Sequence, residues 1–116
     1  MKRYQTGLDG EEKAEKALTA KGMRCLARRY RGADGEIDLI MQDGAMIVFV
    51  EVKDRPLGRA GTGLMAITPA KQRRIAHAAM HYLAATQQTD RQARFDVVEL
   101  TADGLLHIPN AFWPAS

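Results

Sequence analysis

Two stretches of this chain carry the apolar spacing and the end signals of α-helices. The first predicts a helix from about Gly7 to Lys21, with Thr6 as N-cap, acidic residues in its first turns and Gly22 just after its end. The second begins at Thr68-Pro69, a pair typical of an N-cap and first helical position, and predicts a helix to about Thr86.

Short apolar runs bounded by turn residues predict strands. Five are expected, at about residues 23–29, 36–41, 45–53, 94–100 and 105–108, the last ending at Pro109. Asp43-Gly44 is a strong hairpin signal between the second and the third, and the third is apolar on both faces, which is typical of a central strand. The order helix, three strands, helix, two strands predicts an α/β domain, a mixed sheet flanked by helices.

Composition narrows the class of protein. The chain has 116 residues, of which 46% are hydrophobic and 27% charged, so we expect a single globular domain over residues 1–116 and neither a two-domain enzyme nor a disordered chain. The one cysteine, Cys25, excludes an internal disulfide and fits a reducing cytosol. We expect no secretory signal, and the longest apolar run, Ala45–Val50, is too short to span a bilayer. These features predict a cytoplasmic protein with no membrane partner.

Charge is unevenly distributed along the chain. Seventeen Lys and Arg residues against fourteen Asp and Glu residues give a net charge of +3, which is compatible with a polyanionic partner but does not establish one. Basic residues gather in Lys21–Arg31 and Lys53–Arg74, whereas acidic residues gather in Asp9–Glu15 and Asp34–Glu51. Solvated helix faces and strand edges would give the same pattern, so both interpretations stay open.

A carboxylate interrupts the apolar face of the first predicted helix. Leu8, Ala14 and Leu18 share that face, and Glu11 falls near its middle. A carboxylate on a buried face is costly unless it is paired, protonated or bound to a cation. The alternative is a glutamate of the first turn that caps backbone N–H groups.

The predicted hairpin repeats this anomaly. Glu51 and Lys53 continue an apolar face of the third strand. With the turn centred on the predicted pair, Asp38 lies opposite Phe49 and Glu36 opposite Glu51, so Asp38 becomes the diagonal neighbour of Glu51 on one side of the sheet. Only an even shift of this register keeps the core face buried.

Two or three carboxylates and one lysine thus converge at one end of the hairpin. Carboxylates this close repel each other, and a divalent cation with oxygen ligands, Mg²⁺ or Mn²⁺, relieves the repulsion. The lysine would neutralise a phosphate or hold an attacking water. The alternative is a structural cluster of ion pairs.

These residues also resemble a known signature. Asp38, twelve intervening residues and Glu51-Val52-Lys53 look like the Asp…Glu-x-Lys signature of restriction-endonuclease-like nucleases, in a hairpin like that of archaeal Holliday junction resolvases. The whole chain resembles more specifically the YraN type, a small bacterial family of predicted endonucleases. The matching segments are residues 7–14, 35–40, 48–55, Lys71, 94–98 and 107–112.

The resemblance implies a restriction-endonuclease-like core and a set of site residues. It implies metal binding by Asp38, Glu51 and the Val52 carbonyl, with Glu11 lining the site and Lys53 as the catalytic lysine. All four charged residues would then meet in one cleft. The resemblance implies no other cofactor.

One segment departs from the family pattern. An aromatic-glycine element is expected in residues 56–64, where this chain has Leu57-Gly58 and further glycines. No Gly-Lys-Ser/Thr follows these glycines, so we expect a loop over the active site and not a phosphate-binding loop.

The function that follows is a metal-dependent endonuclease that hydrolyses phosphodiester bonds in DNA, with branched or structured DNA as the expected substrate. Six basic residues should rim the cleft and bind nucleic acid: Arg28, Arg29, Arg31, Arg55, Lys71 and Arg74. A homodimer is compatible with the resemblance, because resolvase-like enzymes cut two strands symmetrically. The alternatives are a non-catalytic nucleic-acid-binding module of the same fold and a protein-interaction domain, and neither needs the complete set of charged site residues.

Overall fold

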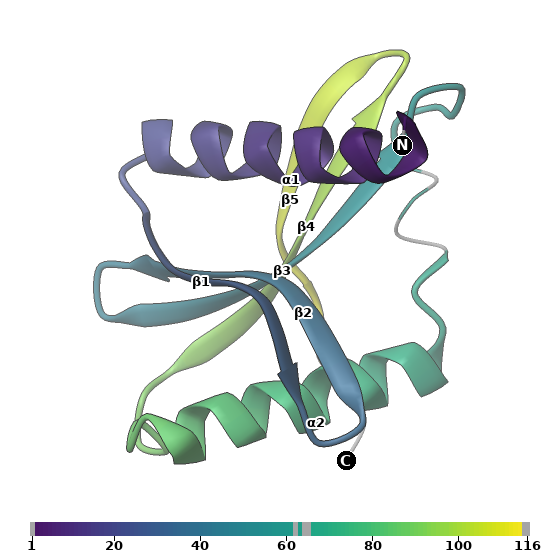
Figure 1. The fold of residues 1–116 in the computed structure, drawn as a ribbon. Helices are drawn as coiled ribbons and strands as arrows, with labels where there is room; N and C mark the ends of the chain where they lie inside the picture. The colour runs from purple at the N-terminus through teal and green to yellow at the C-terminus, as the bar shows by residue number, and fades with distance from the viewer. Residues whose placement is uncertain (1, 62, 64–65, 115–116) are drawn as a thin grey trace.

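The computed structural model describes residues 2–61, 63 and 66–114, and its elements follow the predicted order (Figure 1). They are α1 (Lys2–Ala20), β1 (Arg24–Gly32), β2 (Gly35–Asp43), β3 (Met46–Arg55), α2 (Pro69–Ala85), β4 (Ala93–Thr101) and β5 (Gly104–Phe112). Thr62, Leu64 and Met65, which belong to the predicted loop and its continuation, lie outside the described residues.

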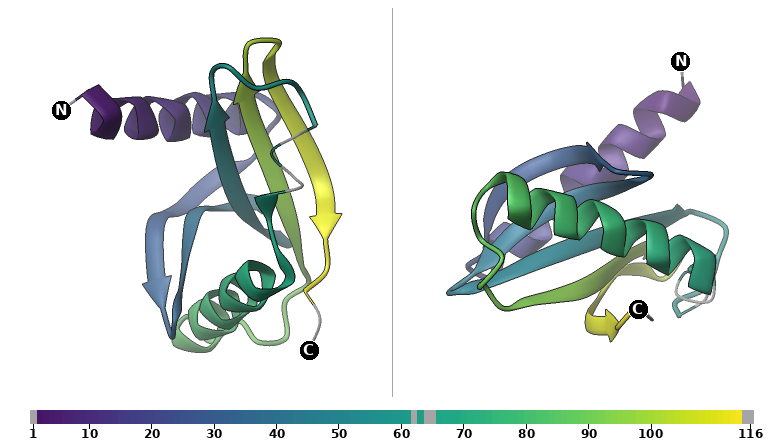
Figure 2. Two further views of the ribbon diagram at one scale, coloured as in Figure 1. Left: turned by 90° about the vertical axis from the view of Figure 1, so that its right-hand side faces the viewer. Right: turned by 90° about the horizontal axis from the view of Figure 1, so that it is seen from below.

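The five strands form one mixed sheet in the order β1-β2-β3-β4-β5. β3 and β4 are parallel, joined through α2, and the other neighbours are antiparallel. The helices cover opposite faces of the sheet, as two perpendicular views agree (Figures 1 and 2). This confirms the expected α/β class, with the element order of a restriction-endonuclease-like core.

The hydrophobic core has one layer on each face of the sheet. On one face α2 packs against the sheet residues Ile37, Ile40, Ile47, Phe49, Phe95 and Val97. On the other face α1 packs against Leu39, Met41, Val48, Val50 and Val98. Each buried residue of this size contributes about 1.5–3 kcal/mol, so this burial, more than helix propensity, holds both helices in place.

β2 bends at Asp38, which lies in the candidate active site described below. Simple alternation places Ile37 on the face of Leu39, but Ile37 packs in the α2 layer instead. The paired residues of β1 and β2 skip Arg29 and Asp38, and Arg29 has a φ of 49°. A left-handed φ interrupts the regular alternation of an extended strand, and beyond this point Ile37 and its partner Tyr30 both pack in the α2 layer.

The register of the β2–β3 hairpin differs from the predicted one. Asp43 pairs with Met46 and Ile40 pairs with Phe49, so the prediction that Asp38 lies opposite Phe49 was wrong by two residues. The two-residue turn is Gly44-Ala45, one position later than expected. Because the shift is even, the paired residues Leu39 to Asp43 keep the faces that the apolar pattern predicts, so that pattern could not distinguish the two registers.

The sequence predicted the end of α1 correctly but not its start. Gly22 follows α1 as expected: its φ is 98°, its N–H donates to Thr19 O and the Met23 N–H donates to Leu18 O, the two bonds of a Schellman motif. α1 begins at Lys2, however, so the predicted N-cap Thr6 lies within the helix.

The start of α2 was also predicted correctly, whereas the end of β5 was not. Thr68 caps α2, where its Oγ1 accepts from the Lys71 N–H at 3.2 Å. β5 continues through Pro109 to Phe112, so its predicted end was wrong. β5 stands at the edge of the sheet, where a proline without an N–H breaks no ladder. Within the part of the chain that the structure describes, neither α1 nor α2 has the length and hydropathy that a membrane span needs.

Candidate active site

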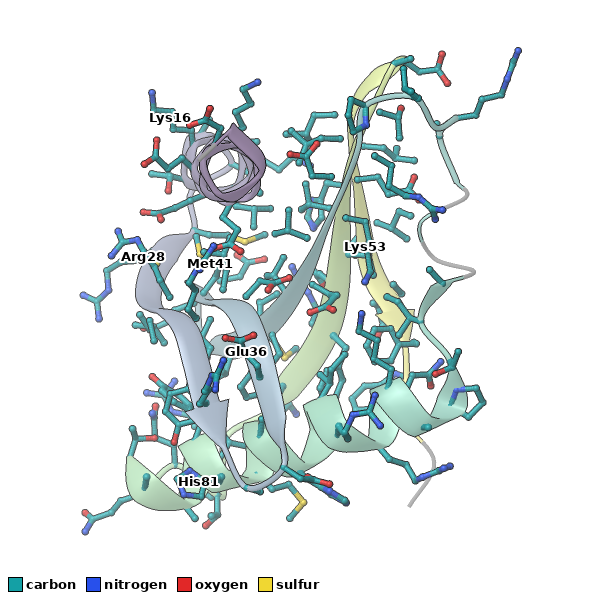
Figure 3. The ribbon with its side chains drawn as sticks, turned by 45° about the vertical axis from the view of Figure 1, so that its right-hand side comes forward. Lys16, Arg28, Glu36, Met41, Lys53 and His81 are labelled. Atoms are coloured by element: carbon teal, nitrogen blue, oxygen red, sulfur yellow. The ribbon has the colours of Figure 1, made fainter. Side chains whose placement is uncertain are left out.

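A cleft of about 630 Å³ lies on the α2 side of the sheet, at the carboxyl end of β3. Its charged lining residues are Arg31, Asp34, Glu36, Asp38, Glu51, Lys53, Lys71 and Arg74. In Figure 3, Glu36 on β2 and Lys53 on β3 lie on either side of this region, above α2. The cleft is therefore built from the bent hairpin, the central strand and the first turns of α2.

Asp38 terminates the pairing between β2 and β3. The paired residues end at Leu39 and Val50, and beyond them the Val52 N–H donates to Asp38 Oδ2 at 2.8 Å. In an extended strand the N–H and the C=O of one residue point to the same edge, so the Val52 carbonyl also faces the Asp38 side. The carboxylate takes the place of a ladder bond and fixes the end of the hairpin.

Glu51 is the centre of the charge cluster. Glu51 is only 8% exposed, and its Oε2 lies 3.5 Å from both Lys53 Nζ and Lys71 Nζ. Continuing the observed register places Asp38 opposite Glu51, closer than the diagonal position predicted. One buried carboxylate thus faces a second carboxylate across the hairpin and two ammonium groups, one from its own strand and one from α2.

Burial changes the proton affinities of this cluster. Desolvation, reinforced by the neighbouring Glu51 carboxylate, raises the pKa of Asp38 to about 7. Desolvation, reinforced by the nearby Lys71, lowers the pKa of Lys53. The first shift reflects above all the burial of the Asp38 carboxylate, to which the charge of Glu51 adds.

Lys71 reaches Glu51 because α2 packs tightly against the β1–β2 hairpin. A Cβ at Gly35 would lie 2.0 Å from the carbonyl oxygen of Arg74, so only glycine allows this approach of strand and helix. The contact fixes the first turns of α2 above the cleft, which brings Lys71 and Arg74 into its lining.

Glu11 lies behind the cleft and is not among its lining residues. It extends from α1 on the opposite face of the sheet and accepts from Arg29 Nε at 2.9 Å. Desolvation raises the pKa of Glu11, and the carboxylates of Asp38 and Glu36 add to this shift. The structure therefore brings Asp38, Glu51 and Lys53 together in the cleft and holds Glu11 next to them, paired with Arg29.

The predicted nucleic-acid residues divide into two groups. Arg31, Lys71 and Arg74 line the cleft. Arg28 instead makes two bonds to Glu15 of α1, of 2.6 and 2.7 Å, and Arg29 is engaged by Glu11. Arg55 is exposed at the end of β3, outside the cleft lining. Glu36, expected opposite Glu51, pairs with Arg31 at 3.5 Å instead.

Sequence reasoning missed Glu99. This residue of β4 is fully buried, and its carboxylate accepts from the N–H groups of Gly61 and Gly63. The loop that these glycines belong to therefore lies against the sheet beside Lys53. A charge inside the apolar strand Phe95–Leu100 was the available signal, the same kind of signal that drew attention to Glu51.

The donor set suits a hard divalent cation. Asp38, Glu51 and the Val52 carbonyl offer oxygen atoms, the ligands that Mg²⁺ and Mn²⁺ prefer. The pKa of Asp38 is raised by burial and, in second place, by the Glu51 charge, and a bound cation would favour the ionised carboxylate against both. Among the described residues, no three His, Cys, Asp or Glu side chains form a metal-holding group, so the third protein ligand of this set would be the main-chain carbonyl.

Fold and site together define an α/β protein with a restriction-endonuclease-like core and an acid-lysine cleft at the end of its central hairpin. The family model described as "Uncharacterised protein family UPF0102" matches residues 10–100. The chain therefore belongs to UPF0102, the YraN family, which confirms the resemblance found in its sequence.

Relatives match over most of their length. A UPF0102 protein of Symbiobacterium thermophilum is 50% identical over 113 residues, which cover 93% of this chain and 96% of the relative. A UPF0102 protein of Geobacter metallireducens is 44% identical over 110 residues, covering 91% and 90%. A third, from Bordetella avium, is 40% identical over 112 residues, covering 97% and 77%.

Proposed function

We propose that this protein is a metal-dependent endonuclease that hydrolyses phosphodiester bonds in DNA. The observation that carries the proposal is the pairing of two carboxylates, Asp38 and Glu51, with two ammonium groups, Lys53 and Lys71, in one cleft. Carboxylates supply cation ligands, and ammonium groups supply positive charge for a phosphate. In a purely structural ion-pair cluster each buried carboxylate would be paired with a cation, whereas both lysines contact Glu51 and burial raises the pKa of Asp38 beside it.

Each residue of the cluster has a role that suits phosphodiester hydrolysis. Asp38, Glu51 and the Val52 carbonyl would hold Mg²⁺ or Mn²⁺, which when bound supplies Lewis-acid polarisation of the phosphoryl oxygen and a more acidic water. Lys53, held beside Glu51, orients the attacking water or stabilises the charge that develops on the phosphoryl group. Lys71 approaches the same carboxylate from α2 and carries a second positive charge to the cleft.

The substrate side of the proposal rests on charge and accessibility. Arg31, Lys71 and Arg74 line an open cleft on a chain of net charge +3, a combination that suits backbone phosphates. The preference for branched or structured DNA follows from the likeness to junction resolvases. A homodimer, in which two clefts cut two strands, extends the same likeness.

A cleavage screen tests the proposal. Linear, nicked, flapped and four-way DNA are incubated with the protein and Mg²⁺ or Mn²⁺, beside Glu51→Gln and Lys53→Ala purified identically. We expect cleavage by the wild type that a chelator abolishes and that both variants lack. Cleavage that persists in both variants would identify a contaminating nuclease. Salt-sensitive DNA binding without any cleavage would favour the non-catalytic binding module, and the absence of both would favour a protein-interaction domain.

A further inference from the structure

Glu99 is a fully buried carboxylate that the proposed chemistry does not use. Its Oε2 accepts from the Gly61 N–H at 2.5 Å, and its Oε1 accepts from the Gly63 N–H. Removing a carboxylate from water is costly, and charge-assisted bonds from backbone N–H groups offset that cost. An asparagine or glutamine amide has one acceptor oxygen, so only a carboxylate serves two donors with equivalent oxygens.

The loop held in this way touches Lys53. Lys53 and Glu99 are register partners on the parallel strands β3 and β4, so their side chains leave the sheet side by side on the α2 face. Gly63 lies over both: a Cβ there would be 2.6 Å from Glu99 Oε1 and 3.0 Å from Lys53 Cβ. The loop backbone therefore forms a wall along the base of the Lys53 side chain.

We propose that Glu99 is a positioning residue, which fixes the loop at Gly61 and Gly63 against Lys53 and so keeps the Lys53 ammonium beside Glu51. Lys53 is largely buried, with its side chain 15% exposed, and Nζ is 3.5 Å from Glu51 Oε2. Without the wall, the side chain gains rotamers that point away from the cleft. The effect of Glu99 on cleavage rests on the proposed endonuclease function, but its effect on Lys53 does not.

The first test reads the exposure of Lys53 and needs no enzymatic activity. The wild type and Glu99→Gln are treated briefly with a lysine-acylating reagent, and the modification of each lysine is followed by peptide mass spectrometry. We expect Lys53 to react about threefold faster or more in the variant, while Lys13, which lies outside the cleft, keeps its rate, because only the wall is loosened. An unchanged Lys53 rate overturns the proposal.

Gly63→Ala provides a second variant that leaves the carboxylate in place. The added methyl group would push the loop off Glu99 and Lys53. We expect the same selective rise at Lys53, and a Glu99→Gln/Gly63→Ala double variant no more reactive than the stronger single one, because both break one contact. If all lysines of Glu99→Gln react faster together, that variant has lost its fold and Gly63→Ala decides. Additive effects overturn the proposal.

Asp103→Asn is the matched control. Asp103 Oδ2 accepts from the Ala60 N–H at 3.1 Å, so it anchors the same loop from the exposed β4–β5 turn, away from Lys53. We expect Lys53 reactivity in Asp103→Asn to equal that of the wild type. A rise equal to that of Glu99→Gln would mean that any loosening of the loop suffices, which overturns the specific role of Glu99.

A second test measures the kinetics of DNA cleavage by Glu99→Gln. We expect Glu99→Gln to lower kcat by about 10- to 100-fold with KM changed less than about threefold, because Lys53 acts on the reacting phosphate and not on overall DNA binding. An unchanged kcat overturns the proposal. If the wild type cleaves no DNA, the endonuclease proposal fails, whereas the Lys53 reactivities still decide the role of Glu99.

Discussion

At the scale of single residues, the charged side chains of the cleft meet at the Glu51 carboxylate. One of its oxygens lies 3.5 Å from two ammonium groups that come from different elements, β3 and α2. Both lysines share this oxygen, and burial, with the Glu51 charge in second place, raises the pKa of Asp38 across the hairpin. A cation and a phosphate, bound together, would satisfy this set better than the side chains satisfy each other.

The two lysines should oppose cation binding and favour cleavage. We expect Lys53→Ala and Lys71→Ala each to bind Mn²⁺ as tightly as the wild type or more tightly, because each removes a positive charge next to a ligand. Lys53→Ala should nevertheless cleave about a hundredfold more slowly. Asp38→Asn and Glu51→Gln should lose both Mn²⁺ binding, measured by calorimetry, and cleavage. Weaker Mn²⁺ binding by Lys53→Ala would contradict these roles.

The pKa of Asp38 predicts how stability depends on pH. A carboxyl whose pKa rises on folding, here from 3.8 to about 7, binds its proton more tightly when folded, so the cation-free protein should lose stability as pH rises through that window. The amide introduced by Asp38→Asn cannot titrate, and its carbonyl oxygen can still accept the Val52 N–H. Asp38→Asn should gain roughly 2–4 kcal/mol relative to the wild type between about pH 4 and pH 8.

Urea unfolding in the presence of a chelator measures the stability of the wild type and of Asp38→Asn at each pH. Profiles of stability against pH that run parallel for the two proteins would contradict the prediction. Glu15→Gln is a control of opposite sign. The bonds from Arg28 lower the pKa of Glu15, so its contribution is present above its ordinary pKa and is lost as pH falls. The cost of Glu15→Gln should therefore shrink toward low pH.

At the scale of elements, the packing of α2 on the β1–β2 hairpin decides whether the cleft forms. Gly35 is the contact point, and there the helix backbone itself is the neighbour, so no flexible side chain can move aside. The bend of β2 at Asp38 turns the hairpin toward α2. The two features together carry Lys71 to Glu51.

Gly35→Ala should therefore separate α2 from the hairpin. We expect the variant to lose about 2 kcal/mol or more of unfolding free energy, as overpacked sites do, and to lose cleavage because Lys71 leaves the cleft. Gly22→Ala is the matched control: its φ of 98° makes alanine unfavourable there, but no atom lies within 4 Å of the new Cβ. It should cost about 1–2 kcal/mol and leave cleavage per folded molecule unchanged.

At the scale of the whole molecule, the basic residues that are neighbours in the sequence do not all lie on one surface. The run Arg28–Arg31 is divided: Arg28 and Arg29 are bound to acids of α1, and Arg31 reaches the cleft. Lys71 and Arg74 approach the same cleft from α2. The surface that suits phosphate is therefore the cleft mouth.

Charge reversal can locate the DNA-binding surface. We expect Lys71→Glu/Arg74→Glu to weaken DNA binding and to reduce the slope of log affinity against log salt by about 2, since about 0.9 is lost per phosphate contact. Arg24→Glu/Arg91→Glu is the matched control with the same change in net charge. Its residues contact Gln42 and the Ala45 carbonyl, at the end of β3 opposite the cleft. Equal loss in both double variants would show that net charge alone binds DNA.

The sequence by itself determined the features that depend on neighbouring residues. The caps at Thr68 and Gly22 mark helix ends because they satisfy backbone groups within one turn. Alternation along β3 puts Glu51 and Lys53 on one face whatever the strand pairs with. For the same reason the element order, the fold class and the acid-lysine pair could be predicted.

Only the tertiary structure decided how these pieces meet. Two registers that differ by two residues bury the same face, so turn geometry, and not the apolar pattern, placed Asp38 opposite Glu51. The packing of α1 on the far face put Glu11 behind the cleft, although the sequence had placed it on the same face of the helix as the buried Ala14 and Leu18. The contacts of Glu51 with Lys71, and of Glu99 with Gly61 and Gly63, join segments that are distant along the chain, and their distances depend on packing that no local pattern contains.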